Sequence, residues 1–404
     1  MTFKVKTKGQ IEGEKLLVPK LRFKGFNNQW RKIKLKDIST DVSYGMNSAA
    51  TEYDGFNKYI RITDIDEETS LYNNNNPVSP SGNLDDKFLV KDNDILFART
   101  GASTGKAYLY NKTDGKLYFA GFLIRANIKK DYNSRFIFEQ TKLGKYNNWV
   151  KIMSIRSGQP GINSIEYGNY EFSITHIDEQ KKIANVIELV NKKIELQKQK
   201  IEALKIYKKG LIQKYFESKN GEKIKISEIL EEVINKTTEN NQYDVISSTK
   251  DGLFLQSEYF NRSIASDNNI GYKILKKNQI VLSPQNLWMG NINYNNKYEI
   301  GMVSPSYKIF NINKNFDKDY ISNLLKTNKA IYYYTINSEQ GASIVRRNLN
   351  MESFYEINFV IPDIEEQNKK GKIINGIAQK IEKEEKKYQK LDKFKKGLLQ
   401  KMFI

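Results

Sequence analysis

Two long stretches of the chain repeat apolar residues at alternating spacings of four and three. In residues 179–216, polar Gln197 and Lys208 interrupt the apolar series, and in residues 366–403 Glu384 and Lys395 interrupt it at matching places. Such a pattern over this length predicts long helices that pair as a coiled coil, each about 57 Å long. The residues predicted at the coiled-coil interface are Ile183, Ile187, Val190, Ile194, Gln197, Ile201, Leu204, Leu211, Ile374, Ile377, Ile381, Glu384, Tyr388, Leu391 and Leu398.

The two stretches also match each other in sequence, which indicates an internal repeat. Residues 208–216 read KKGLIQKYF and residues 395–403 read KKGLLQKMF. The match continues upstream at the same offset as far as Asn163 and Asn350, and further upstream the offset drifts, as expected when loops gain or lose residues. The matching pairs are Asn163 with Asn350, Glu179-Gln180 with Glu366-Gln367, KIKLKDI (32–38) with KIKISEI (223–229), and DILFARTGASTGK (94–106) with QIVLSPQNLWMGN (279–291).

The repeat predicts a domain organisation in which two similar globular units alternate with the two helices. If the helices bury each other along their length, the second must run antiparallel to the first. Gln197 and Glu384 would then lie close together at a pseudo-two-fold axis, and Phe403 would return to the first globular unit. The predicted parts are an N-terminal tail (1–21), a first unit (22–178), a first helix (179–219), a second unit (220–365) and a second helix (366–404).

Each globular unit mixes short β-branched or aromatic runs with Gly and Asn turns, which is typical of strands. Examples are KYIRITDI, KLYFAGFLIRANI and YKIFNI, and helices are expected only near residues 134–149 and 317–337. The expected fold class is therefore α+β, with one small domain used twice.

Composition narrows the function. The formal net charge of the 404-residue chain is +19, which favours a polyanionic partner, and nucleic acid is the leading class. The chain has no Cys and a single His, His176, so thiolate metal sites and cysteine nucleophiles are excluded. No signal peptide and no apolar run of membrane-spanning length is found, so a cytoplasmic location is expected.

Basic and amide side chains follow the predicted strands in two loop clusters of each unit. Arg, Asn and Gln can read base edges, whereas Ser, Thr and Lys hold phosphates, so these loops are the predicted DNA contacts. Ordinary polar loops remain the alternative. The candidates are Arg99, Ser103, Thr104, Lys106, Arg156, Ser157, Gln159 and Asn163 in the first unit, and Gln285, Asn286, Trp288, Ser343, Arg346, Arg347 and Asn348 in the second.

No catalytic motif is complete. GASTGK (101–106) has three residues between its glycines and Ala107 after the Lys, so it is not a phosphate-binding Walker loop. No convergent carboxylates and no glycine-rich cofactor loop are recognised, so neither catalytic nor metal-binding residues are predicted. Two alternatives stay open: a stand-alone DNA methyltransferase or nuclease, and a coiled-coil scaffold that does not bind DNA.

Several segments resemble the specificity subunit of type I restriction–modification systems. They are VPKLRFKGFNNQWRKIKLKDIS (18–39), SGQPGINS (157–164), HIDEQKKIA (176–184) and the paired KKGL phrases. The resemblance implies a non-catalytic subunit with two target recognition domains, each reading half of a split DNA sequence, and an antiparallel coiled coil between them. It also implies a role in phage defence.

The resemblance further implies partners that carry the chemistry. These are two copies of an adenine methyltransferase subunit, which uses S-adenosylmethionine, and restriction (translocase–nuclease) subunits, which use ATP and Mg. No cofactor is expected on this chain itself. The second copy has GASIVRRN where the first has SGQPGINS, so its loop is expected to meet DNA differently.

Overall fold

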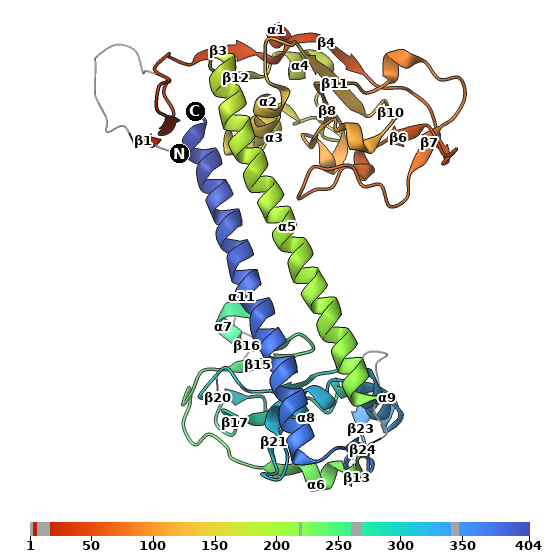
Figure 1. Ribbon diagram of the computed structural model, residues 1–404, viewed down its shortest axis with the longest axis vertical. Helices are drawn as coiled ribbons and strands as arrows, with labels where there is room; N and C mark the ends of the chain where they lie inside the picture. Colours follow the sequence, from red (N-terminus) through yellow and green to blue (C-terminus); the bar gives the residue numbers. More distant parts are fainter. Residues whose placement is uncertain (1–2, 6–16, 218–219, 260–267, 341–346) are drawn as a thin grey trace. The chain divides into compact units, whose positions relative to one another are not determined.

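The computed structural model describes residues 3–5, 17–217, 220–259, 268–340 and 347–404. It forms two compact units (Figure 1). The first comprises Met1–Gln197 together with Lys387–Ile404, and the second comprises Lys198–Lys386. Each unit therefore contains one globular part and a portion of both long helices. Within the described residues, no helix is long and apolar enough to cross a membrane.

The long helices are α5 (Ile177–Phe216) and α11 (Ile364–Met402). All the residues predicted at the coiled-coil interface are buried or half-buried. In the second unit, Lys200 on α5 forms a 2.9 Å ion pair with Glu384 on α11, and Lys370 lies over the ring of Tyr215. Because the later residue of α5 meets the earlier residue of α11, the two helices are antiparallel there, as predicted.

The stripe position Glu384 is 4% exposed, and Lys200 supplies the countercharge that a carboxylate buried among apolar residues needs. The predicted proximity of Gln197 and Glu384 stays a prediction, because these two residues belong to different units.

Both units are built around a four-stranded antiparallel sheet with the same strand order. The first sheet has the order β4 (Ser39–Tyr44), β11 (Leu123–Ile128), β8 (Asp94–Ala98) and β9 (Ala107–Leu109). The second has the order β14 (Leu230–Val233), β21 (Lys308–Ile312), β18 (Gln279–Leu282) and β19 (Ile292–Tyr294). The repeated topology confirms that one α+β unit is used twice.

Pairs of short strands complete each unit. In the first they are β1 (Phe3–Val5) with β2 (Leu21–Phe23), β3 (Arg31–Lys34) with β12 (Glu171–Ile174), β5 (Ala50–Glu52) with β7 (Val78–Pro80), and β6 (Lys58–Ile60) with β10 (Leu117–Phe119). In the second they are β13 (Glu222–Lys225) with β24 (Asn358–Ile361), β15 (Ile246–Thr249) with β16 (Gly252–Leu255), β17 (Lys273–Lys276) with β20 (Ile300–Val303), and β22 (Ser338–Gln340) with β23 (Arg347–Leu349).

The single helix expected near residues 134–149 is two helices, α2 (Ser134–Gln140) and α3 (Gly144–Met153). Likewise, residues 317–337 form α8 (Lys318–Leu324) and α9 (Asn328–Ile336). The shorter α-helices are α1 (Leu35–Ile38), α4 (Ser164–Gly168), α6 (Ile226–Ile229), α7 (Gln256–Tyr259) and α10 (Met351–Tyr355). The 3₁₀ turns are η1 (Ile62–Asp64), η2 (Asp86–Phe88), η3 (Gly101–Ser103), η4 (Lys112–Asp114) and η5 (Leu287–Met289).

The matched Glu-Gln pairs have a structural reason. Gln180 at the start of α5 accepts a 3.0 Å hydrogen bond from the backbone N–H of Asn133, the residue that precedes α2. Gln367 at the start of α11 accepts one of the same length from Asp317, which precedes α8. Both glutamines are buried, so each long helix is tied to its globular unit by an enclosed hydrogen bond.

The end of the chain completes the core of the first unit. Leu398, Leu399, Met402 and Phe403 are buried in the same cluster as Trp30 and Phe136. The rings of Phe403 and Phe136 have centroids 5.0 Å apart. This contact confirms the prediction that Phe403 lies against the first globular unit.

Candidate nucleic-acid interface

In the first unit, the structure brings the two predicted loop clusters together. The backbone N–H of Ile162 donates to the carbonyl of Arg99 at 2.9 Å, and that of Gly101 donates to Pro160 at 2.9 Å. Gly101 has φ of +71°, and a Cβ there would lie 2.8 Å from Nε2 of Gln159. The close approach of the two loops thus explains a glycine at this position.

Arg99 lies against an aromatic ring, that of Tyr44, which the sequence analysis did not predict as part of the site. Its guanidinium carbon lies 4.8 Å from the centroid of the Tyr44 ring, and its Nη1 donates to the carbonyl of Gly121. The side chain and the backbone N–H of Ser164 form hydrogen bonds with the hydroxyl of Tyr44, which lowers the pKa of Tyr44. Tyr44 is 41% exposed, so cation and ring form a solvent-facing pair of the kind that contacts nucleic acid.

Several of the predicted DNA contacts are held by intramolecular bonds. Arg156 forms a 2.6 Å ion pair with Glu166 and donates to the carbonyls of Met153 and Ile155. Asn163 is the N-cap of α4, where it accepts from the N–H of Glu166 at 2.9 Å. Its repeat partner Asn350 caps α10 in the same way. Helix capping therefore accounts for this matched Asn pair.

The remaining first-unit candidates differ in whether their side chains are bonded within the protein and in how exposed they are. Thr104 donates to the carbonyl of Gly101, and Lys106 lies 3.9 Å from Glu67. Ser103 is half-buried, whereas Ser157 and Gln159 are exposed. Large exposed apolar side chains lie on the same loops and near them, and the sequence analysis did not identify them. They are Phe122, Ile155 and Ile165, which are 61%, 73% and 74% exposed.

The second unit repeats the arrangement of the loops. The backbone N–H of Arg347 donates to the carbonyl of Gln285 at 3.3 Å, and the Arg347 guanidinium donates to the carbonyl of Ser338 at 2.8 Å. Gln285 and Asn348 are exposed, and Asn286 and Trp288 are half-buried. The candidates Ser343 and Arg346 lie outside the described residues.

The second loop pair differs from the first in having two buried hydrogen-bond donors without a partner among the described residues. Nε1 of Trp288 and Nε of Arg347 are buried, and neither has a hydrogen-bond partner among the described residues. Arg347 keeps one internal bond while part of its guanidinium stays unsatisfied. Because Nε of Arg347 is buried, only the other N–H groups of this half-buried guanidinium can reach an external acceptor.

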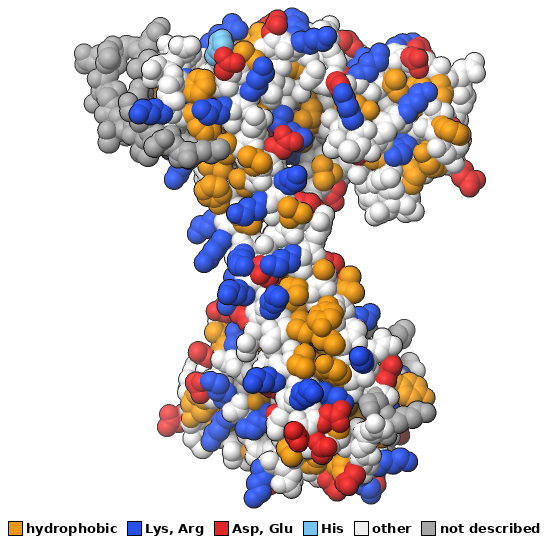
Figure 2. Space-filling view, in the orientation of Figure 1, with side chains coloured by type: hydrophobic (Ala, Val, Ile, Leu, Met, Phe, Trp, Pro, Cys, Tyr) orange, Lys and Arg blue, Asp and Glu red, His pale blue; other side chains and the backbone are white. Residues whose placement is uncertain are grey.

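Positive charge follows the long helices as well as the loops. Figure 2 shows Lys and Arg side chains gathered along them. Ion pairs neutralise some of these lysines, such as Lys396 with Asp392 and Lys386 with Glu382. A surface of this kind attracts the phosphates of a nucleic acid.

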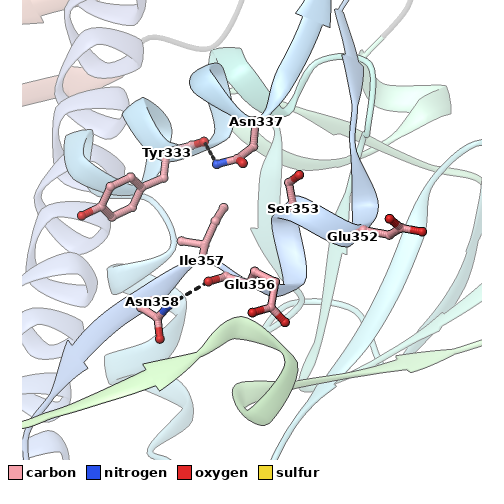
Figure 3. A pocket seen from close by; sticks show the side chains of 7 residues that line it. All are labelled: Tyr333, Asn337, Glu352, Ser353, Glu356, Ile357 and Asn358. Atoms are coloured by element: carbon pink, nitrogen blue, oxygen red, sulfur yellow. Dashed lines mark hydrogen bonds between the residues drawn. The ribbon is translucent and has the colours of Figure 1, made fainter.

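A hollow beside α9, α10 and β24 in the second unit has a different character. It has a volume of about 500 Å³ and is lined by Tyr333, Asn337, Glu352, Ser353, Glu356, Ile357 and Asn358 (Figure 3). Its two carboxylates and the absence of any Lys or Arg in its lining make it unsuited to phosphates. In the described part of the chain, no three Asp, Glu or His side chains converge as metal ligands would.

The chain is similar to known proteins in both sequence and fold. Residues 27–206 match the family model of the type I restriction modification DNA specificity domain. The crystal structure of the type I restriction–modification S subunit from M. genitalium has a TM-score of 0.61 and 16% sequence identity, covering 96% of this chain and 99% of that chain. A structure that addresses complex assembly and conformational transition of the type I R-M system has a TM-score of 0.55 and 11% identity, covering 93% and 97%. These findings confirm that the chain resembles type I restriction–modification specificity subunits, through the sequence of its first half and through its fold over nearly the whole length.

Proposed function

We propose that this chain is the DNA-binding specificity subunit of a type I restriction–modification complex, and that each unit reads one half of a bipartite DNA target. The observation that supports this most is the duplication. Both units have the same sheet order, and in both the loop that follows β8 or β18 is hydrogen-bonded to a second polar loop. Two similar binding surfaces on one chain suit a target with two separate parts.

Within each unit, some side chains of the loop pair would contact base edges and others would contact phosphates. Exposed Gln159 and the Arg99–Tyr44 pair are candidates for base contacts in the first unit, and Gln285, Asn348 and Arg347 in the second. Arg156 and Asn163 are proposed to shape the loop, because their side chains are used within it. The helices would set the distance between the two half-sites, on the order of one to one and a half turns of duplex.

The chain is proposed to recruit catalytic subunits and to carry out no chemistry itself. The partners would be two adenine methyltransferase subunits with S-adenosylmethionine and restriction subunits with ATP and Mg. Exposed apolar side chains on the long helices support a protein partner there, because such residues are normally covered. Leu189 and Leu196, seven residues apart on α5, face the same way and are 61% and 56% exposed. Tyr207 on α5 and Phe394 on α11 are also exposed.

Selection from a random duplex library tests the proposal. The purified complex of this chain with its methyltransferase subunit should enrich fragments that share two short blocks with a spacer of fixed length and free sequence. Enrichment of one continuous block, or of none, would contradict readout by two units. Methylation or cleavage of DNA by the chain alone would show that it is an enzyme.

A further inference from the structure

The two units place a pair of lysines at the same point of their structure. Lys142 follows α2 in the first unit, and Lys326 follows α8 in the second, each nine residues after the capped start of its helix. Their neighbours are Lys395 and Lys208, which interrupt the apolar stripes of the long helices within the matched KKGL phrases. Burial lowers the pKa of Lys142 and of Lys326, and the charge of the neighbouring lysine, Lys395 or Lys208, lowers it further. Like charges have thus been placed together twice.

In the first unit, a buried carboxylate compensates the two lysines. Glu139 on α2 is 1% exposed, and its Oε1 accepts a 3.3 Å hydrogen bond from Asn191 on α5. Burial raises the pKa of Glu139, whereas the charges of Lys395, Arg135 and Lys142 lower it. The carboxylate is therefore the countercharge of this cluster.

In the second unit, the equivalent of Glu139 is Asn323, which carries no charge. Its side-chain NH₂ donates to the carbonyl of Asp319 at 2.7 Å. Burial lowers the pKa of Lys208, with no acid acting on it among the described residues. The side chain of Lys326 is exposed as a whole, but burial at its ammonium group and the charge of Lys208 lower its pKa, and Asp251 opposes this. The lysine pair has been kept, but an asparagine replaces the carboxylate at the position equivalent to Glu139.

A cavity lies where the carboxylate is missing. It has a volume of about 240 Å³, and its lining includes Lys208, Asn293, Lys297, Ser322, Asn323 and Lys326. Asn293 is 3% exposed; Ser248 and Thr249 hold its amide group, and its oxygen accepts a 2.6 Å hydrogen bond from Lys326. The one carboxylate in the lining, Asp319, accepts from Asn375 at 3.0 Å. The cavity is smaller than the pockets that hold drug-sized ligands, so it suits a small ion or a single group.

We propose that this cavity binds a phosphate group between Lys208 and Lys326, at the place where the first unit holds the Glu139 carboxylate. Two ammonium groups can meet a doubly charged oxyanion, and the hydroxyl of Ser322 and the amide of Asn323 are further donors in the lining. The source of the phosphate group is either free inorganic phosphate or the backbone of a nucleic acid. The inference does not depend on the proposed role in target recognition.

Calorimetric titration of the full-length chain with inorganic phosphate, at constant ionic strength, tests the site. One phosphate per chain is expected to bind. Lys208→Gln and Asn323→Glu should each weaken binding at least tenfold, the first by removing an ammonium and the second by restoring the carboxylate. Lys329→Gln removes the same charge from an exposed position on α9 and should leave the affinity within twofold.

Thermal unfolding keeps the test informative if a variant is less stable. Asn323→Glu should unfold at a higher temperature than the wild type without phosphate, and phosphate should no longer stabilise it. If a nucleic-acid backbone is the source, phosphate should compete with a short duplex, and Lys208→Gln should reduce the salt dependence of duplex binding; if free phosphate is the source, duplex binding should not change. Absence of both phosphate binding and competition, or equal phosphate affinity in wild type, Lys208→Gln and Asn323→Glu, would overturn the proposal.

Discussion

Phe403, one residue from the end of the sequence, packs against Phe136 in the first unit with ring centroids 5.0 Å apart. Its ring also meets Trp30 edge-on at 6.4 Å. Trp30 and Phe136 belong to the globular part of the unit, so the last turn of α11 fills a core that the first half of the chain leaves incomplete. Long-range packing of this kind makes the stability of the first unit depend on the far end of the chain.

Phe403→Ala should therefore destabilise the first unit. Removing a buried aromatic side chain typically costs about 3–5 kcal/mol, from lost burial and from the cavity left behind. Urea unfolding followed by tryptophan fluorescence, to which Trp30 and Trp149 of the first unit contribute, would measure the change. Phe394→Ala is the matched control, because Phe394 lies on the same helix and is 55% exposed. A loss of stability equal to that of the control would contradict the packing role of Phe403.

The Lys142 site predicts how stability changes with pH. Burial lowers the pKa of Lys142 from its ordinary value of 10.5 to about 8 in the folded chain. Between these values the unfolded chain binds more protons at this position than the folded chain does. The free energy of unfolding should therefore rise as the pH increases from 8 to 10.

Lys142→Met should remove this contribution, so that the variant's free energy of unfolding rises less than that of the wild type over the same range. Urea unfolding at pH 8 and pH 10 compares the two. Lys145→Met, at an exposed position on α3, serves as the control. Equal pH dependence in wild type and Lys142→Met would show that Lys142 titrates normally.

Arg347 is expected to contribute to recognition by the second unit. If its free guanidinium donors meet a base, Arg347→Ala should weaken binding by roughly 1–3 kcal/mol and relax specificity in one half-site only. The same expectation applies to Arg346, which lies outside the described residues. Competition between duplexes altered in either half-site would measure the effect. A uniform loss on all duplexes would instead assign Arg347 to phosphate contact, and unchanged binding would exclude it.

Lengthening both long helices tests whether they set the spacing of the half-sites. One heptad is added to α5 between residues 184 and 208, and one is added to the part of α11 that pairs with this segment. Each insertion extends its helix by about 10.5 Å without turning the apolar face. The tolerated spacer should grow by about three base pairs, at 3.4 Å per base pair. Binding to duplexes with graded spacers would measure this. An unchanged optimal spacer length would show that the helices do not set the spacing of the half-sites.

The duplication and the long helices were predictable because they depend on local patterns. The heptad stripe identified α5 and α11, and the KKGL phrases aligned the two units. The match between Asn163 and Asn350 could also be found in the sequence. Their role as helix caps could not, because an asparagine side chain can serve either as an N-cap or as a base-reading amide. Sequence spacing alone could not separate the two roles.

Other features could not be predicted because they depend on contacts between distant segments. The pair of Arg99 and Tyr44 joins the loop after β8 to the last residue of β4 in the first unit. The cluster of Glu139, Lys142 and Lys395 joins the first globular part to the end of the chain. Lys208 and Lys395 looked like plain interruptions of an apolar stripe. Only the folded units show that Lys395 lies near the carboxylate of Glu139, whereas Lys208 lines a cavity with Asn323.

The most direct test of the central proposal is a genome-wide map of methylated adenines from cells that carry this system and a chimera of it. In the chimera, residues 22–178 are exchanged for those of a related chain with another target. We predict a bipartite motif in which one half changes, while the other half and the spacer stay the same. A continuous motif, or a motif that changes in both halves, would contradict separate readout by the two units.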